Sequence, residues 1–135
     1  MDIYASELIY DGLKSYNESK GKPFGNEVVD EEPLDPIYPL TIIQETRNVQ
    51  NPNYRNPMEL VSSIGFSVEI YAQDTGDKTK KQVARELAKL AFDYMTAIGF
   101  EQSGFVPDGL VRDASLHRII MTFTGNLHEN SRRII

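Results

Sequence analysis

The tripeptide Asp74-Thr75-Gly76 is the first candidate for chemistry, because aspartic protease active sites carry the same three residues. Such a protease needs two of these carboxylates sharing one proton, supplied by two lobes or by a dimer of an all-β fold. Here the tripeptide joins a predicted strand to a predicted helix, where Asp, Thr and Gly are ordinary turn and capping residues. We therefore expect a turn at this position and not a catalytic aspartate.

Other residue types that bind metals or phosphate occur without a complete motif. His117 and His128 are the only histidines, cysteine is absent, and neither histidine has a partner at metal-ligand spacing. The run Gly76-Asp77-Lys78-Thr79 lacks the leading glycine of a phosphate-binding loop. Asp30-Glu31-Glu32 with Asp35 lacks the glycine and the alternation of a calcium loop, so a solvated acidic loop is expected. The sequence thus predicts no catalytic residue, no cofactor and no metal site.

Composition favours one globular domain over residues 1–135. The chain has 135 residues, of which 40% are hydrophobic and 25% charged, and this is an ordinary balance for a domain with a core. No apolar run approaches the length of a membrane span, and the N-terminus lacks the basic and apolar parts of a signal segment. The formal net charge of −6 argues against a dedicated nucleic-acid binder. We expect synthesis in a reducing cytoplasm and no membrane partner.

The N-terminal half predicts one helix, two strands and two long connections. Apolar residues recur at helical spacing over residues 3–16, with Asp2 as the N-cap and Gly12 in the apolar stripe. Glycine there costs about 1 kcal/mol against alanine, which close approach to another backbone would explain. β-branched residues predict a strand over 38–49, and strict alternation predicts another over 63–73, with Ile64, Phe66, Val68, Ile70 and Ala72 on its buried face. Proline, glycine and asparagine predict long loops at 20–36 and 47–62.

The C-terminal half predicts a long helix and a closing strand. The apolar stripe over residues 78–98 predicts the helix, and Gly99 is placed to end it in the left-handed conformation. Residues 100–105 predict a possible short strand, followed by a turn at Pro107-Asp108-Gly109. Alternation over 117–127 predicts the final strand.

Together these elements predict an α+β fold. It consists of a mostly antiparallel sheet of three to four strands with two helices packed on one face, in the order α-β-β-α-(β)-β. Aromatic and basic residues that fall off the apolar stripes or in the loops are the candidates for contact with another subunit or a partner. These candidates are Tyr10, Tyr54, Arg55, Tyr71 and Phe92.

In the order and residue pattern of these elements the chain resembles the tail terminator (tail completion) proteins of long-tailed, siphovirus-type bacteriophages. The resemblance covers nearly the whole length. It rests on the amphipathic N-terminal helix, the strands Tyr38-Pro-Leu-Thr-Ile-Ile43 and Phe66-Ser-Val-Glu-Ile-Tyr-Ala72, the helix end at Gly99-Phe100 and the closing strand Arg118-Ile-Ile-Met-Thr-Phe-Thr124.

The resemblance implies a catalytically inert virion protein of the phage neck. It implies a homo-oligomeric ring, a hexamer in this family, that caps the tail tube and joins it to the head. The implied partners are other copies of the chain, the tail tube protein and the head–tail connector (stopper) protein. Viral DNA would pass through the lumen without specific binding, and an acidic subunit would repel its phosphates.

Two other interpretations of the sequence stay open. One is a different head–tail connector or a minor capsid or tail subunit, because such subunits share this size and composition. The other, from a different class, is a small enzyme or a ligand-binding α+β domain, with a site formed by Asp, Tyr and His residues that one sequence cannot align.

Overall fold

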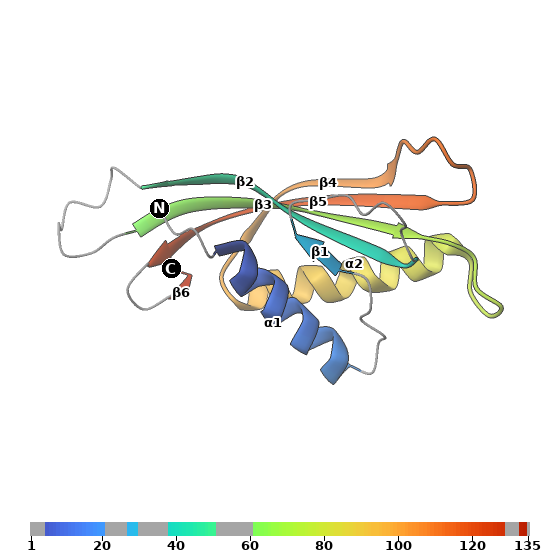
Figure 1. Cartoon of the computed structure of the whole chain (residues 1–135), viewed down its shortest axis with the longest axis horizontal. Coiled ribbons are helices and arrows are strands. Elements are labelled where there is room, and N and C mark those ends of the chain that lie inside the picture. Colours follow the sequence, from blue (N-terminus) through green and yellow to red (C-terminus); the bar gives the residue numbers. More distant parts are fainter. Residues whose placement is uncertain (1–4, 21–26, 30–37, 51–60, 129–132, 135) are drawn as a thin grey trace.

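The computed structural model describes residues 5–20, 27–29, 38–50, 61–128 and 133–134. The elements in chain order are α1 (Ala5–Ser19), β1 (Glu27–Val29), β2 (Leu40–Gln50), β3 (Val61–Ala72), α2 (Lys80–Ala97), β4 (Glu101–Gly109), β5 (His117–His128) and β6 (Arg133–Ile134). The strands form one twisted sheet, and both helices lie on the same face of it (Figure 1).

The sheet confirms the predicted α+β class. Its strand order is β1-β2-β3-β5-β4, and β2, β3, β5 and β4 pair antiparallel to one another. Two short strands were not predicted: β1 pairs parallel with the start of β2, and β6 pairs with the end of β5. β1 lies inside the segment 20–36 that was expected to be a loop, because three residues are too few to show a period of two. The expected loop 47–62 is also shorter, since β2 runs to Gln50 and β3 begins at Val61.

The core lies between the sheet and the two helices. The predicted alternation of β3 is confirmed, because Ile64, Phe66, Val68 and Ile70 are all fully buried. Across the antiparallel pairing they meet the inward-facing residues of β5, and both helices close the core from the same side. This arrangement makes β3 and β5 the central strands on which the rest of the domain is built.

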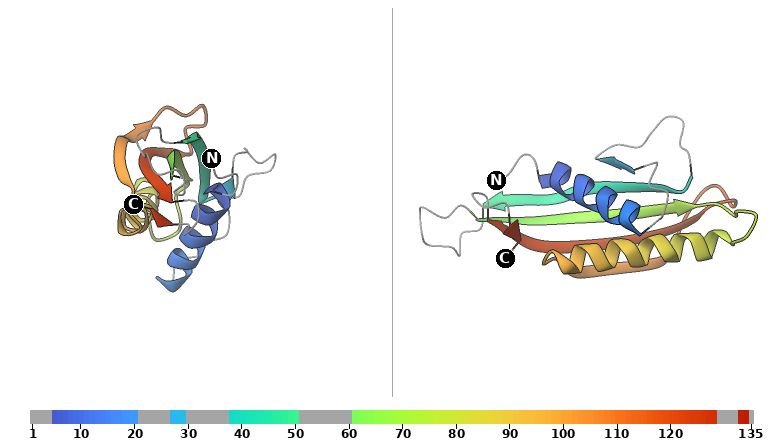
Figure 2. Two further views of the ribbon diagram at one scale, coloured as in Figure 1. Left: turned by 90° about the vertical axis from the view of Figure 1, so that its left-hand side faces the viewer. Right: turned by 90° about the horizontal axis from the view of Figure 1, so that it is seen from below.

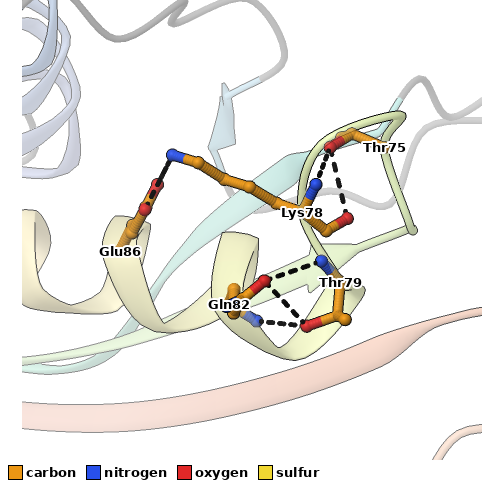
Figure 3. A network of polar contacts seen from close by, with 5 residues as sticks. All are labelled: Thr75, Lys78, Thr79, Gln82 and Glu86. Atoms are coloured by element: carbon orange, nitrogen blue, oxygen red, sulfur yellow. Dashed lines mark hydrogen bonds and ion pairs between the residues drawn. The ribbon is translucent and has the colours of Figure 1, made fainter.

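Helix α2 has well-defined ends, and Figure 3 shows the N-terminal one. The side chain of Thr79 accepts a hydrogen bond from the backbone N–H of Gln82, and the Gln82 side chain accepts one from the backbone N–H of Thr79. This capping box starts the helix two residues after the predicted position. At the other end Gly99 has φ 110°, and the backbone N–H of Phe100 donates to the carbonyl of Met95 at 2.9 Å. The predicted glycine stop is therefore confirmed.

Helix α1 ends three residues later than predicted, at Ser19, and the predicted N-cap Asp2 lies outside the described residues. The explanation expected for Gly12 was wrong. A side chain lies against this glycine, that of Tyr94 on α2, and not another backbone. No helix in the described part of the chain is both long and apolar enough to cross a bilayer.

Strand β4 is longer than the predicted strand over 100–105. It continues through Pro107-Asp108-Gly109, which were expected to form a turn. The pairing with β5 shifts register between Val106 and Gly109, so the proline sits in a bulge on the outermost strand. Proline is tolerated there because no ladder hydrogen bond needs its missing N–H.

Candidate interaction surface

The turn around Asp74 is a helix-capping structure. The Asp74 carboxylate accepts a hydrogen bond at 2.7 Å from the backbone N–H of Lys80, the first residue of α2. The hydroxyl of Thr75 accepts from the N–H of Lys78 at 3.0 Å and holds the preceding turn (Figure 3). Each of these polar groups has a local structural role. Within the described ranges, no three His, Asp or Glu side chains are grouped so that they could hold a metal ion.

The predicted contact residues lie on different parts of the surface. Tyr10 on α1 is half-buried and packs against the core. Tyr71 lies on the sheet face away from the helices, since it alternates with the buried residues of β3. Phe92 on α2 is 38% exposed. Tyr54 and Arg55 lie outside the described residues, and the three described candidates lie on three different elements.

Phe92 borders an apolar groove between α2 and the edge strand β4. The groove has a volume of about 320 Å³. Its lining comes from α2 (Arg85, Ala88, Lys89, Phe92), β4 (Gln102, Phe105) and β5 (Ile119, Met121). The helix contributes one wall, the edge strand the other, and β5 the floor.

The groove exists because the sheet extends past α2. Phe105 pairs with Met121, so it faces the helix side of the sheet, yet it remains 53% exposed. Seen from below in Figure 2, α2 lies toward the β5 and β4 side and α1 toward the β2 side. β4 therefore has an outward-facing edge and an apolar side chain that the helix leaves partly uncovered.

Basic side chains border this groove. Lys81, Arg85 and Lys89 recur every four residues along α2 and share one side of the helix. Lys89 forms an ion pair with Asp93 at 3.1 Å, whereas no ion pair among the described residues engages Lys81 or Arg85. The groove thus combines an apolar floor with a positively charged wall.

Sequence reasoning found Phe92 but missed Phe105, which lines the same groove and is 53% exposed. It also missed Val106 and Leu110, which are 45% and 93% exposed, but Val106 pairs with Ile120 and so faces the other side of the sheet. Phe105 was the last residue of the short strand predicted over 100–105 and Val106 lay just beyond it, so no surface role was inferred for either. The available signal was an aromatic and a valine directly before a proline, which is typical of an edge strand.

A polar cluster on the opposite face of the sheet includes the predicted residue Tyr71. Arg118 forms a 3.0 Å ion pair with Glu69, and the Tyr71 hydroxyl donates to the same carboxylate at 3.1 Å. The guanidinium of Arg118 also lies 5.5 Å from the centre of the Tyr71 ring and donates to the carbonyl of Leu110 at 3.2 Å. These contacts hold β3, β5 and the β4–β5 connection together, so Tyr71 has a structural role in the subunit.

The β4–β5 connection has further polar contacts of its own. Asp113 accepts hydrogen bonds from the hydroxyl and the backbone N–H of Ser115, at 2.7 and 2.9 Å, and these lower the pKa of Asp113. The His117 ring lies 2.9 Å from the carbonyl oxygen of Pro107 and 3.4 Å from the Asp108 carboxylate. Both sets of contacts order the loop that leads back from β4.

Comparison with known proteins does not name a family. The chain matches no protein-family model, and no curated protein is similar to it. Its function therefore has to be inferred from its own residues. Among the described ones, Phe92 and Phe105 are exposed aromatic residues that lie together in the groove between α2 and β4.

Proposed function

We propose that this chain is a structural subunit of the neck or tail of a long-tailed bacteriophage. Copies of it would form a ring that caps the tail tube and joins it to the head connector. The observation that supports this function best is the groove between α2 and β4, because contiguous exposed apolar surface on a small domain marks a protein–protein contact.

The sheet edges also support an assembly role. β4 is the terminal strand on one side, and on the other side β1 pairs only with Thr41–Ile43 of β2. Along residues 44–50 of β2, no described strand pairs with the outer edge. Two different edges on one subunit suit a ring, in which each copy contacts one neighbour with one surface and a second neighbour with the other.

Charge is compatible with a channel for DNA. The net charge of −6 would repel phosphates and limit adhesion of a passing genome. The basic residues of α2 lie beside the apolar groove, where a protein partner would cover them.

The groove also favours a second candidate function, a small-ligand domain. Its volume of about 320 Å³ lies at the lower end of the range for ligand pockets. A ligand site usually adds several convergent polar groups to an apolar lining. This groove has Gln102 and two basic side chains on its rim, which suit a protein surface better.

Deletion of the gene from the phage that encodes it tests the proposed function. We expect electron micrographs of lysates to show DNA-filled heads beside unjoined or overlong tails, with normal virions restored by the gene in trans. Normal virions in the deletion lysate would overturn the proposal. Empty heads with joined tails would assign the chain to another connector position, the alternative that the sequence left open.

A further inference from the structure

We infer that the groove between α2 and β4 binds the acidic outer face of α1 of a second copy, in a head-to-tail contact. The inference rests on the proposed function and specifies which surfaces of the subunit would meet in its ring. Three observations carry it: complementary charge, the positions of the two faces, and exposed aromatic side chains in the groove.

The two helices carry opposite charges on their outer faces. Glu7, Asp11 and Glu18 are exposed and share one side of α1, and Lys14 lies among them and offsets one of these charges. On α2, Arg85 and Lys89 line the groove, and Lys81 lies one turn before Arg85 on the same side of the helix. No ion pair within the described residues involves any of the three acids. One subunit therefore carries an acidic face on α1 and a basic side on α2 that could pair with each other only between different copies.

The two helices lie toward opposite edges of the sheet. α1 contacts β1 and β2, whereas α2 contacts β3, β5 and β4. In Figure 2 the helices lie toward these opposite edges on the same sheet face. When a second copy is placed side by side beyond β4, its α1 comes next to the α2 of the first copy. A contact between two different surfaces repeats from copy to copy and closes into a ring when the rotation permits.

Exposed aromatic side chains lie in the groove itself. Phe92 and Phe105 line it and are 38% and 53% exposed. Burial of these rings from water favours association, and the flanking charges fix its direction. A second copy is a better occupant of the groove than an unrelated acidic segment, because its acidic α1 meets one neighbour while its own groove meets the next.

Charge reversal on each helix tests this contact. One variant carries Lys81→Glu and Arg85→Glu, a second carries Asp11→Lys and Glu18→Lys, and a third carries all four changes. Lys81 lies in the first turn of α2 and Glu18 in the last turn of α1, so these reversals suit the helix dipoles and should preserve folding. Circular dichroism checks this. Lys20→Glu with Arg112→Glu is the control for the same change of net charge at exposed residues outside the two proposed faces.

Assembly is measured by sedimentation velocity in solution and by electron microscopy on purified tail tubes. We expect each two-residue reversal to reduce ring formation at least tenfold, about the effect of one lost charge-pair contact. The four-residue variant should restore ring formation, and so should an equimolar mixture of the two-residue variants, because every contact is then complementary again. The Lys20 and Arg112 control should assemble normally.

Two results would overturn the inference while leaving the proposed function intact. In the first, the two-residue variants form rings as well as the original protein does. In the second, they fail but neither the mixture nor the four-residue variant recovers, which would mean that the two helix faces do not meet. A folded original protein that forms no ring in solution or on tail tubes would instead contradict the proposed function, and the inference with it.

Discussion

The phenol oxygen of Tyr94 on α2 occupies the position that a Cβ on Gly12 of α1 would take. The Tyr94 ring also packs against Tyr16, one turn further along α1, with ring centres 5.7 Å apart. The absence of a side chain at Gly12 leaves room for the Tyr94 ring, so the two helices can pack together on one face of the sheet.

Replacement of Gly12 by alanine should destabilise the protein in spite of alanine's better helix propensity. Propensity alone would add about 1 kcal/mol of stability, but the new methyl group collides with Tyr94, and overpacking of this kind costs about 1–3 kcal/mol. Urea unfolding measures the balance. In a Tyr94→Leu background the same change should cost less or become stabilising, and an equal cost in both backgrounds would contradict the contact.

Tyr94 should also make the protein less stable in alkaline solution. Burial raises the pKa of Tyr94 above its ordinary value of 10.0, because the folded state disfavours the phenolate. Above about pH 10 the unfolded chain loses this proton and the folded chain keeps it, so the free energy of unfolding falls as the pH rises through the raised pKa. Below that pH the contribution is fully present. Urea unfolding at several pH values should give a steeper decline for the original protein than for Tyr94→Phe, and equal slopes would contradict the assignment.

The buried face of β3 gives a direct test of the core. Val68 is fully buried, so Val68→Asp places an unpaired charge between sheet and helices and should abolish folding. Val49→Asp is the matched control, since Val49 is 45% exposed and the same change there should leave the circular dichroism spectrum unchanged. A folded Val68→Asp variant would show that the face of β3 carrying Val68 is not the buried one.

These tests involve features that the sequence predicted to different degrees. The alternation of β3 and the glycine stop of α2 were predictable. An apolar residue at every second position indicates a strand with one buried face, and a glycine directly after an amphipathic run indicates a helix end. The length of β4 was not, since its bulge at Pro107 interrupts the alternation and resembles a turn. The groove could not be predicted, because it depends on where α2 lies across the sheet. Phe92 was identified as a surface aromatic, but its partner Phe105 emerged only from the pairing with β5.

Substitutions of Asp74 distinguish a structural role of its carboxylate from a catalytic one. Its carboxylate accepts the N–H of Lys80, an interaction of the capping type that is worth about 1 kcal/mol. Asp74→Asn keeps an acceptor of the same shape and should leave thermal stability and virion assembly nearly unchanged, while Asp74→Ala should lower the unfolding free energy by about 1 kcal/mol. Loss of phage viability in a folded Asp74→Asn variant would indicate a chemical role for the carboxylate.

The central claim is that copies of this chain form a closed ring at the end of a tail tube. Native mass spectrometry of the purified protein, alone and after release from purified tails, tests it most directly. We predict one discrete assembly from tails, with a mass that is a whole multiple of the 15.3 kDa subunit and corresponds to a hexamer for a tail terminator. A 15.3 kDa monomer both in solution and from intact tails would contradict the claim.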